Sequence, residues 1–95
     1  MPSLKVAHIH EQGQNMIIFP LDHRFAALSQ GEKDSELQIL EIRANNAGLA
    51  GHAVAVWDAG SGRMGFIGPR QWHGFLQSIG LRWVLANLNK EISWS

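Results

Sequence analysis

Two short apolar runs constrain the fold of this chain more than any other feature. Met16–Phe19 and Ala53–Trp57 are apolar at every position, so each run, as a strand, must be covered on both faces. Two helices on one side of a sheet cannot provide that cover. Either the helices and the tail wrap both faces, or a second copy of the chain covers the open face, which would make the protein a homodimer.

The length and composition indicate one domain. The chain has 95 residues, of which 45% are hydrophobic and 17% are charged, and this is enough to bury one core and too little for two. We expect a single α+β domain over residues 1–95. Residues 1–3 and 93–95 are expected to fray, and residues 22–34 are expected to form a loop.

The first part of the chain predicts a hairpin. Leu4–Glu11 and Asn15–Leu21 are strand-prone runs separated by three residues with a glycine in the middle, a gap short enough for a tight connection. Pro20 is expected to end the pairing, because proline has no backbone N–H to donate. Within the loop that follows, residues 23–28 have the pattern of one helical turn.

A helix is predicted over Glu36–Ala47. Ser35 and Gln38 have the spacing of a capping box, in which two side chains satisfy free backbone N–H groups of the first turn. Gly48 follows at the position where glycine commonly ends a helix. Two apolar residues lie off the buried stripe of this helix, Ile39 and Ile42.

The second half of the chain predicts another hairpin and a last helix. Gly51–Trp57 and Arg63–Ile67 flank a glycine-rich connection, and Pro69 fits the first turn of a helix. This helix is expected to kink at Gly80, and Lys90–Ser95 alternates like an edge strand. The buried stripe of the helix is expected to comprise Trp72, Phe75, Leu76, Ile79, Trp83 and Val84.

These segments predict the element order β-β-α-β-β-α. We expect an antiparallel four-stranded sheet with two helices packed mainly on one face. The sequence shows no internal repeat that would indicate a duplicated unit.

A G-x-G-x-x-G pattern, typical of phosphate-binding loops, occurs at residues 60–65. A dinucleotide-binding loop needs a helix that opens at the glycines and an acidic residue about 20 residues further on. Here Pro69 follows four residues after Gly65, and too little chain remains. A hairpin turn explains the glycines better, with Gly65 leaving room for a large neighbour such as a tryptophan. Backbone N–H groups in such a loop, with arginines beside them, can still bind an anion.

Charge and cysteine content argue against several classes of function. Eight Lys and Arg residues balance eight Asp and Glu residues, so no overall field attracts nucleic acid or an anionic membrane. Residues 1–50 carry a net charge of −2 and residues 51–95 one of +2, an asymmetry that can orient two copies head to tail. With no cysteine, the chain has no disulfide and no thiolate metal site. We recognise neither a signal peptide nor a membrane-spanning run, and expect a cytoplasmic protein.

We expect the protein to be a non-enzymatic binding module that associates with itself or with another protein, without a cofactor. Tryptophan beside arginine is typical of the residues that dominate binding energy at protein interfaces. Stacking of single-stranded nucleic acid on the same residues is an alternative, which the neutral charge argues against. The expected contact surface spans the glycine-rich hairpin and the start of the last helix: Trp57, Asp58, Arg63, Arg70, Trp72 and His73.

The histidines offer a metal-binding alternative. His8 and His10 are two residues apart and therefore share one face of a strand, and His52 is placed to start another strand that can lie beside it. Imidazoles so arranged can bind Zn²⁺ or another divalent transition metal, and the protein would then be a metal-binding protein or a small metalloenzyme.

A hydrolase triad can also be composed from the sequence. Ser61 or Ser78 would be the nucleophile, His73 the base and Asp58 the residue that orients it. No G-x-S-x-G motif accompanies these residues. Asp58 fits better as a turn residue that accepts a hydrogen bond from its own backbone, and we assign no catalytic residue.

Overall fold

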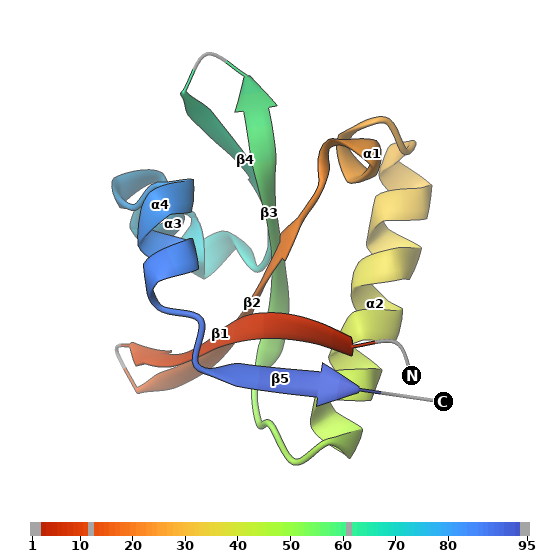
Figure 1. Cartoon of the computed structure of the whole chain (residues 1–95), viewed down its shortest axis with the longest axis vertical. Coiled ribbons are helices and arrows are strands. Elements are labelled where there is room, and N and C mark those ends of the chain that lie inside the picture. Colours follow the sequence, from red (N-terminus) through yellow and green to blue (C-terminus); the bar gives the residue numbers. More distant parts are fainter. Residues whose placement is uncertain (1–2, 12, 61, 94–95) are drawn as a thin grey trace.

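The computed structural model describes residues 3–11, 13–60 and 62–93, which form one sheet between two layers of helices (Figure 1). The sheet has five strands in the order β4-β3-β2-β1-β5. The strands are β1 (Ser3–Glu11), β2 (Gln14–Leu21), β3 (His52–Gly60), β4 (Arg63–Ile67) and β5 (Lys90–Ser93).

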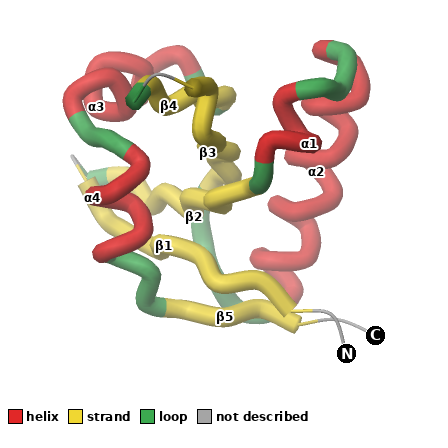
Figure 2. Tube along the Cα trace, turned by 45° about the horizontal axis from the view of Figure 1, so that its top comes forward, coloured by secondary structure: helices red, strands yellow, loops and turns green. Residues whose placement is uncertain are grey.

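Helices cover both faces of the sheet. In Figure 2, α1 and α2 lie on one side of the strands, and α3 and α4 lie on the other. The expectation that two helices pack mainly on one face is therefore wrong. The helical segments are α1 (His23–Ala26), α2 (Gln30–Asn46), the 3₁₀ turn η1 (Arg70–Trp72), α3 (His73–Ser78) and α4 (Leu81–Ala86).

The sheet is mixed, which corrects the expected antiparallel four-stranded sheet. β2 and β3 are parallel, with Met16 opposite His52 and Leu21 opposite Trp57. The other three strand pairs are antiparallel. The parallel pair follows from the connection, because α2 carries the chain along the sheet and back to the starting end, as a parallel crossover requires. The fifth strand is the tail segment that alternates in the sequence, and it pairs with β1 at the sheet edge.

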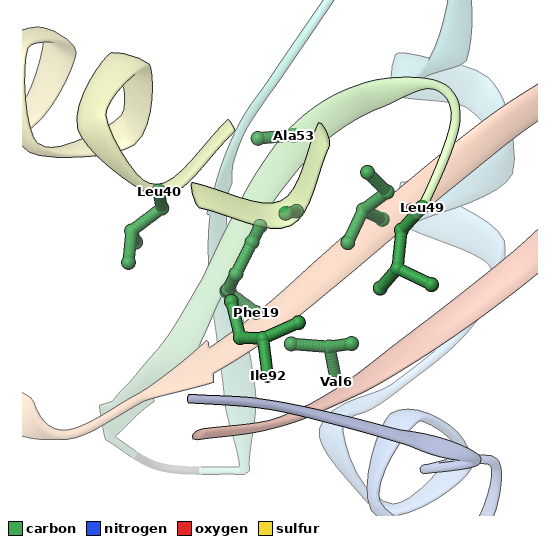
Figure 3. Packing of buried hydrophobic residues seen from close by; sticks show 8 residues of the cluster. Val6, Phe19, Leu40, Leu49, Ala53 and Ile92 are labelled. Atoms are coloured by element: carbon green, nitrogen blue, oxygen red, sulfur yellow. The ribbon is translucent and has the colours of Figure 1, made fainter. Parts of the chain in front are cut away.

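The strands β2 and β3 are buried on both faces, as their apolar runs predict. Ile17 and Phe19 point toward the α2 side, into a core that includes Leu40 of α2 and Ile92 of β5 (Figure 3). Met16 and the side chains that alternate with these residues point toward α3 and α4, into a second core. Because the chain's own helices cover both faces, no second copy is needed to complete the sheet.

The pairing of β2 corrects one expectation in the first hairpin. The antiparallel pairing with β1 is confirmed, with Ala7 opposite Ile18. Pro20 does not end the strand, because β2 stays paired with β3 through Leu21. A proline lacks only the donor, so the pairing of the residues around it can continue along the parallel neighbour.

Helix α2 begins six residues before the predicted start, inside the region expected to be a loop. Its capping box uses Ser29 and Glu32 in place of the predicted Ser35 and Gln38. The Glu32 backbone N–H donates to the Ser29 hydroxyl at 3.2 Å, and the Ser29 backbone N–H donates to the Glu32 carboxylate at 2.9 Å. The predicted helical turn within residues 23–28 is confirmed by α1.

The capping box predicts a pH dependence at Glu32. The hydrogen bonds from Ser29 hold the pKa of the Glu32 carboxyl below its ordinary value of 4.5. A carboxylate with a lowered pKa stabilises the fold above its unfolded pKa, and this contribution is lost as the pH falls through the folded value. We expect the carboxyl resonance of Glu32, followed by NMR, to titrate below 4.5. A midpoint at or above 4.5 would contradict the box, and Ser29→Ala should return the midpoint only part of the way toward 4.5, because alanine keeps the backbone N–H that bonds the carboxylate.

The end of α2 is confirmed as predicted. Gly48 adopts φ +92° just after the C-cap residue Ala47. The N–H of Gly48 donates to the Asn45 carbonyl and that of Leu49 to the Ala44 carbonyl, each at 3.0 Å. These two bonds form the Schellman arrangement that satisfies free carbonyls at a helix end.

The predicted last helix is broken into three pieces. Gly80 is in an extended conformation and begins α4 as its N-cap, so the chain is interrupted there and not merely kinked. Gly80 has low helix propensity, and this favours a break of the helix at that residue. At the chain ends, Ser3 and Ser93 are paired with each other, and the rest of the expected fraying lies outside the described residues.

Candidate functional site

The tip of the β3–β4 hairpin extends beyond the helices (Figure 1). Asp58 is exposed, and its Oδ1 accepts from the Gly60 backbone N–H at 2.8 Å, which confirms the turn role that the sequence favours. The strand register shifts between Asp58 and Gly60, which forms an irregularity at the tip. Arg63 begins β4 on the other side of this turn and is exposed. Ser61 lies outside the described residues.

A second arginine follows the far end of β4. Arg70 opens η1 and is exposed. Gly68 packs closely against Val54, and His73 bonds back to this link through its Nε2, 3.0 Å from the Gly68 carbonyl oxygen. The His73 ring also meets the edge of Phe66 at 5.3 Å between ring centroids. His73, the first residue of α3, thus fastens the start of α3 to the end of β4 and is half-buried.

Trp57 lies in the core of the protein. Its side chain lies on the α1 and α2 side of the sheet, 9% exposed. The Phe25 ring lies 5.2 Å away between centroids, and the Lys33 ammonium lies 5.2 Å from the indole centroid. Gly65 lies directly against the indole, so the room that the sequence assigns to this glycine is occupied by Trp57.

Trp72 is buried on the opposite side of the sheet. It is 3% exposed and packs in the core beneath α3 and α4. The two tryptophans therefore lie in separate cores with the sheet between them, and neither can stack a nucleic-acid base on an open face. Of the six predicted contact residues, three remain exposed. We call these three, Asp58, Arg63 and Arg70, the hairpin surface.

The three histidines of the predicted metal site do not form one ligand set. His52 is opposite Met16, whose side chain faces the α3 and α4 core, and the His52 ring lies 6.1 Å from the Trp72 ring. His8 is opposite Ile17, whose side chain faces α2, so His8 and His10 lie on the other face. β2 also separates β1 from β3.

Each of these histidines has a hydrogen-bonding or ion-pair partner of its own. His8 Nε2 lies 2.9 Å from the Ala50 carbonyl oxygen, and His10 Nδ1 lies 2.8 Å from Asn15 Oδ1. His52 Nδ1 lies 3.4 Å from a carboxylate oxygen of Glu41. Across the described residues, no three His, Cys, Asp or Glu side chains form a group that could hold a metal ion.

The triad residues are also engaged separately. The Ser78 hydroxyl donates to the Phe75 carbonyl at 2.6 Å. His73 contacts the Gly68 carbonyl, and Asp58 contacts Gly60 in its own turn. Each of these contacts holds local backbone, and none of them joins the described residues Ser78, His73 and Asp58 to one another.

The glutamate beside His52 has a structural role. Its carboxylate accepts from the Ala53 backbone N–H at 2.7 Å, at the start of β3 where β4 does not yet pair. An open cavity of about 430 Å³ lies here, with Glu41 and Gln38 of α2 on one wall and Pro69 on the other. A more apolar groove of about 530 Å³ lies between α1 and α2, lined by Phe25 and Leu28 among others.

Sequence reasoning missed the two exposed apolar side chains of α4, Trp83 and Leu85. Trp83 was expected to lie in the buried stripe of the last helix, but the break at Gly80 turns it outward. For α2, the position of Ile39 and Ile42 off the buried stripe already indicates in the sequence that these two side chains are exposed. The exposed large apolar residues among those described are Ile39, Ile42, Trp83 and Leu85.

Comparison with known protein families, with curated proteins and with solved structures found no match for this chain. Among the described residues, no helix combines the length and the apolar character that crossing a membrane requires.

Proposed function

We propose that the protein is a small non-enzymatic binding module that associates with itself or with another protein, and that the hairpin surface is one of its contact regions. The observation that carries this proposal is the pair of exposed arginines at the two ends of β4. Arg63 and Arg70 form no ion pair with any described residue.

The strand between these arginines supports the same proposal. Among the described strands, β4 is at the edge of the sheet and pairs with β3 alone. An edge strand presents backbone groups to which an extended segment of a partner can add. Cations at both ends of the strand favour a partner segment with acidic side chains, because complementary charge raises the association rate and fixes the register. In this proposal His73 holds the backbone next to the hairpin surface in place, and Trp57 and Trp72 contribute only by packing in the two cores.

Charge reversal of both arginines tests this proposal. The chain is immobilised and used to capture partners, and each captured protein is then purified and titrated. We expect Arg63→Glu combined with Arg70→Glu to weaken binding at least tenfold, because two attractive contacts become repulsive. Lys5→Glu combined with Lys90→Glu is the matched control, since it reverses two charges on the pair β1–β5, away from β4.

The control variant distinguishes a specific contact at Arg63 and Arg70 from a general effect of the net charge of the protein. Equal loss of binding in both double variants would contradict a contact at the hairpin surface. Unchanged binding in the Arg63 and Arg70 variant, with an unchanged melting temperature, would also contradict it.

A further inference from the structure

The indole N–H of Trp57 has no acceptor among the described residues, although the side chain is only 9% exposed. The polar atoms of tyrosine and tryptophan usually find a hydrogen-bond partner when they are buried. Within the described residues, no fully buried side-chain nitrogen or oxygen atom lacks such a partner, so the Trp57 N–H reaches solvent. It is therefore available to an acceptor that comes from outside the chain.

This N–H lies over β4, at the edge of the described sheet. Trp57 is opposite Gly65 in the β3–β4 register, and directly opposed residues of antiparallel strands share a face. A Cβ atom at Gly65 would meet Nε1 and Cε2 of the indole first, so the N–H end of the ring lies over the glycine. Because glycine has no side chain, a neighbouring strand can bring a side chain of its own over this point.

Two cationic side chains lie on the same face of the sheet as the indole. Lys33 of α2 is half-buried, and its ammonium lies 5.2 Å from the indole centroid. Arg63 is exposed and two residues from Gly65, so the two share a face of β4. Its side chain is long enough to span the roughly 7 Å between these positions. Neither cation forms an ion pair with a described residue.

The acidic residues next to Trp57 and Lys33 in the sequence are bonded or directed elsewhere. Asp58 alternates with Trp57 along β3 and therefore lies on the opposite face. Glu32 accepts the N-cap hydrogen bond of α2 at 2.9 Å, and Asp34 accepts from a glutamine side chain of the same helix at 3.0 Å. The indole N–H, the ammonium and the guanidinium thus form a group of three donors, which we call the Gly65 site.

The backbone of β4 offers further hydrogen bonds beside the Gly65 site. The Ala53 N–H donates to a glutamate side chain of α2 and therefore points away from β2. Backbone groups alternate along a strand, so those of Trp57 point toward β4 and those of its partner Gly65 point back toward β3. The N–H and C=O groups of Met64 and Phe66 are then directed toward the open edge, where an extended segment can pair with them.

We infer that the edge of β4 binds an extended partner segment that carries a glutamate or aspartate opposite Gly65, and that the Gly65 site holds its carboxylate. A residue opposite Gly65 in an added strand projects its side chain onto the same face, over the glycine and toward the three donors. Donors that include two cations hold a carboxylate more strongly than a neutral side chain of the same shape. The inference deepens the proposed function and rests on it, and it gives Trp57 a second role besides packing.

Two capped peptides test the inference by NMR titration of the isotope-labelled protein. One is acetyl-Thr-Val-Glu-Val-Thr-amide, and the other has Gln in place of Glu, so they differ by one charge. We expect the Glu peptide to bind about tenfold more tightly. It should also move the Trp57 indole N–H resonance downfield, because a hydrogen bond to oxygen deshields the proton. Loss of one indole resonance in Trp57→Phe assigns that signal.

Lys33→Gln tests the same site without changing the core. The variant removes one cation, so the affinity for the Glu peptide should fall about fivefold, whereas the affinity for the Gln peptide should stay the same. Lys5→Gln is the matched control, since Lys5 is exposed on β1, which β2 and β3 separate from β4. Added salt should weaken binding of the Glu peptide and leave that of the Gln peptide unchanged.

Three results would overturn the inference. Equal affinity of the two peptides, with shifts of the Met64 and Phe66 amides, would remove the Gly65 site while strand addition and the proposed function stand. Equal loss of Glu-peptide affinity in Lys33→Gln and Lys5→Gln would mean that net charge alone attracts the peptide. Binding of neither peptide at about 5 mM would exclude the site, and a captured partner that responds to reversal of Arg63 and Arg70 would still support the proposed function.

Discussion

Gly51→Ala is expected to lower the free energy of unfolding by about 3–5 kcal/mol. Gly51 ends the connection from α2 and has φ +125°, a conformation that residues with a side chain rarely adopt. A Cβ atom there would lie 2.5 Å from the Asn15 carbonyl oxygen and 2.8 Å from its carbonyl carbon. Both atoms belong to the backbone of β2, so the sheet itself would have to move.

Gly48→Ala is the matched control for this change. Gly48 also has positive φ, at +92°, but no atom of the described residues lies within 4 Å of the added methyl group. Its replacement should cost about 1–2 kcal/mol, from backbone conformation alone. Urea unfolding of both variants then separates the steric part from the conformational part. Equal costs at the two positions would contradict the close approach of Gly51 to β2.

This close approach occurs where the parallel pair begins, the part of the fold that the sequence did not predict. The apolar runs of β2 and β3 correctly indicate strands buried on both faces. Hydrophobic pattern carries no information about strand direction, however, because parallel and antiparallel central strands bury the same side chains. The direction depends on the path of the connection, and the sequence pattern of Ser35 and Gln38 placed the start of α2 six residues after the observed start.

The last helix shows a different limit of sequence reasoning. The apolar spacing around Gly80 fits one continuous helix, and glycine within a helix is only moderately unfavourable. Two short helices satisfy the same spacing, since Leu76 and Val84 both reach the core. The break becomes favourable only because the chain must return to place β5 beside β1. This pairing is a contact between distant parts of the chain, which local sequence does not reveal.

The structure separates the polar residues of the predicted contact surface from its tryptophans. Asp58, Arg63 and Arg70 are exposed as a contact surface requires. Trp57 and Trp72 were assigned to the same surface because they are close to these residues in the sequence. Strand alternation places Trp57 beneath the α2 side, and the turn at η1 carries Trp72 to the other side. Which side each tryptophan occupies depends on the helices of both layers.

The assignment of His52 failed for a related reason. Residues two apart on one strand share a face, so His8 and His10 are placed together by sequence alone. Whether residues of two different strands share a face depends also on the order and register of those strands. With β2 between them and His52 in the row of Met16, His52 faces the other way.

The second large effect is expected at Gly65, where a methyl group would collide with Trp57. The Cβ atom would lie 2.7 Å from Cζ2 of the indole and closer still to Nε1 and Cε2. Phe25 and Lys33 contact the same indole and limit its movement. We expect Gly65→Ala to cost about 2–3 kcal/mol of unfolding free energy, as overpacking of a well-packed core does. Gly74→Ala is the control, because that glycine lies in α3 with nothing within 4 Å, and its replacement should be neutral or slightly stabilising.

A double-mutant cycle with Trp57→Leu identifies the cause of that cost. Trp57→Leu is itself destabilising because it removes aromatic packing, but it leaves the space above Gly65 open. In that background Gly65→Ala should cost less than about 0.5 kcal/mol, so the coupling energy should approach the full 2–3 kcal/mol. Thermal and urea unfolding of the four proteins measure it. Additive costs would mean that Gly65 is required by the backbone of β4 and not by the indole, and Trp57 would then have no part in shaping the edge strand that carries Arg63 of the hairpin surface.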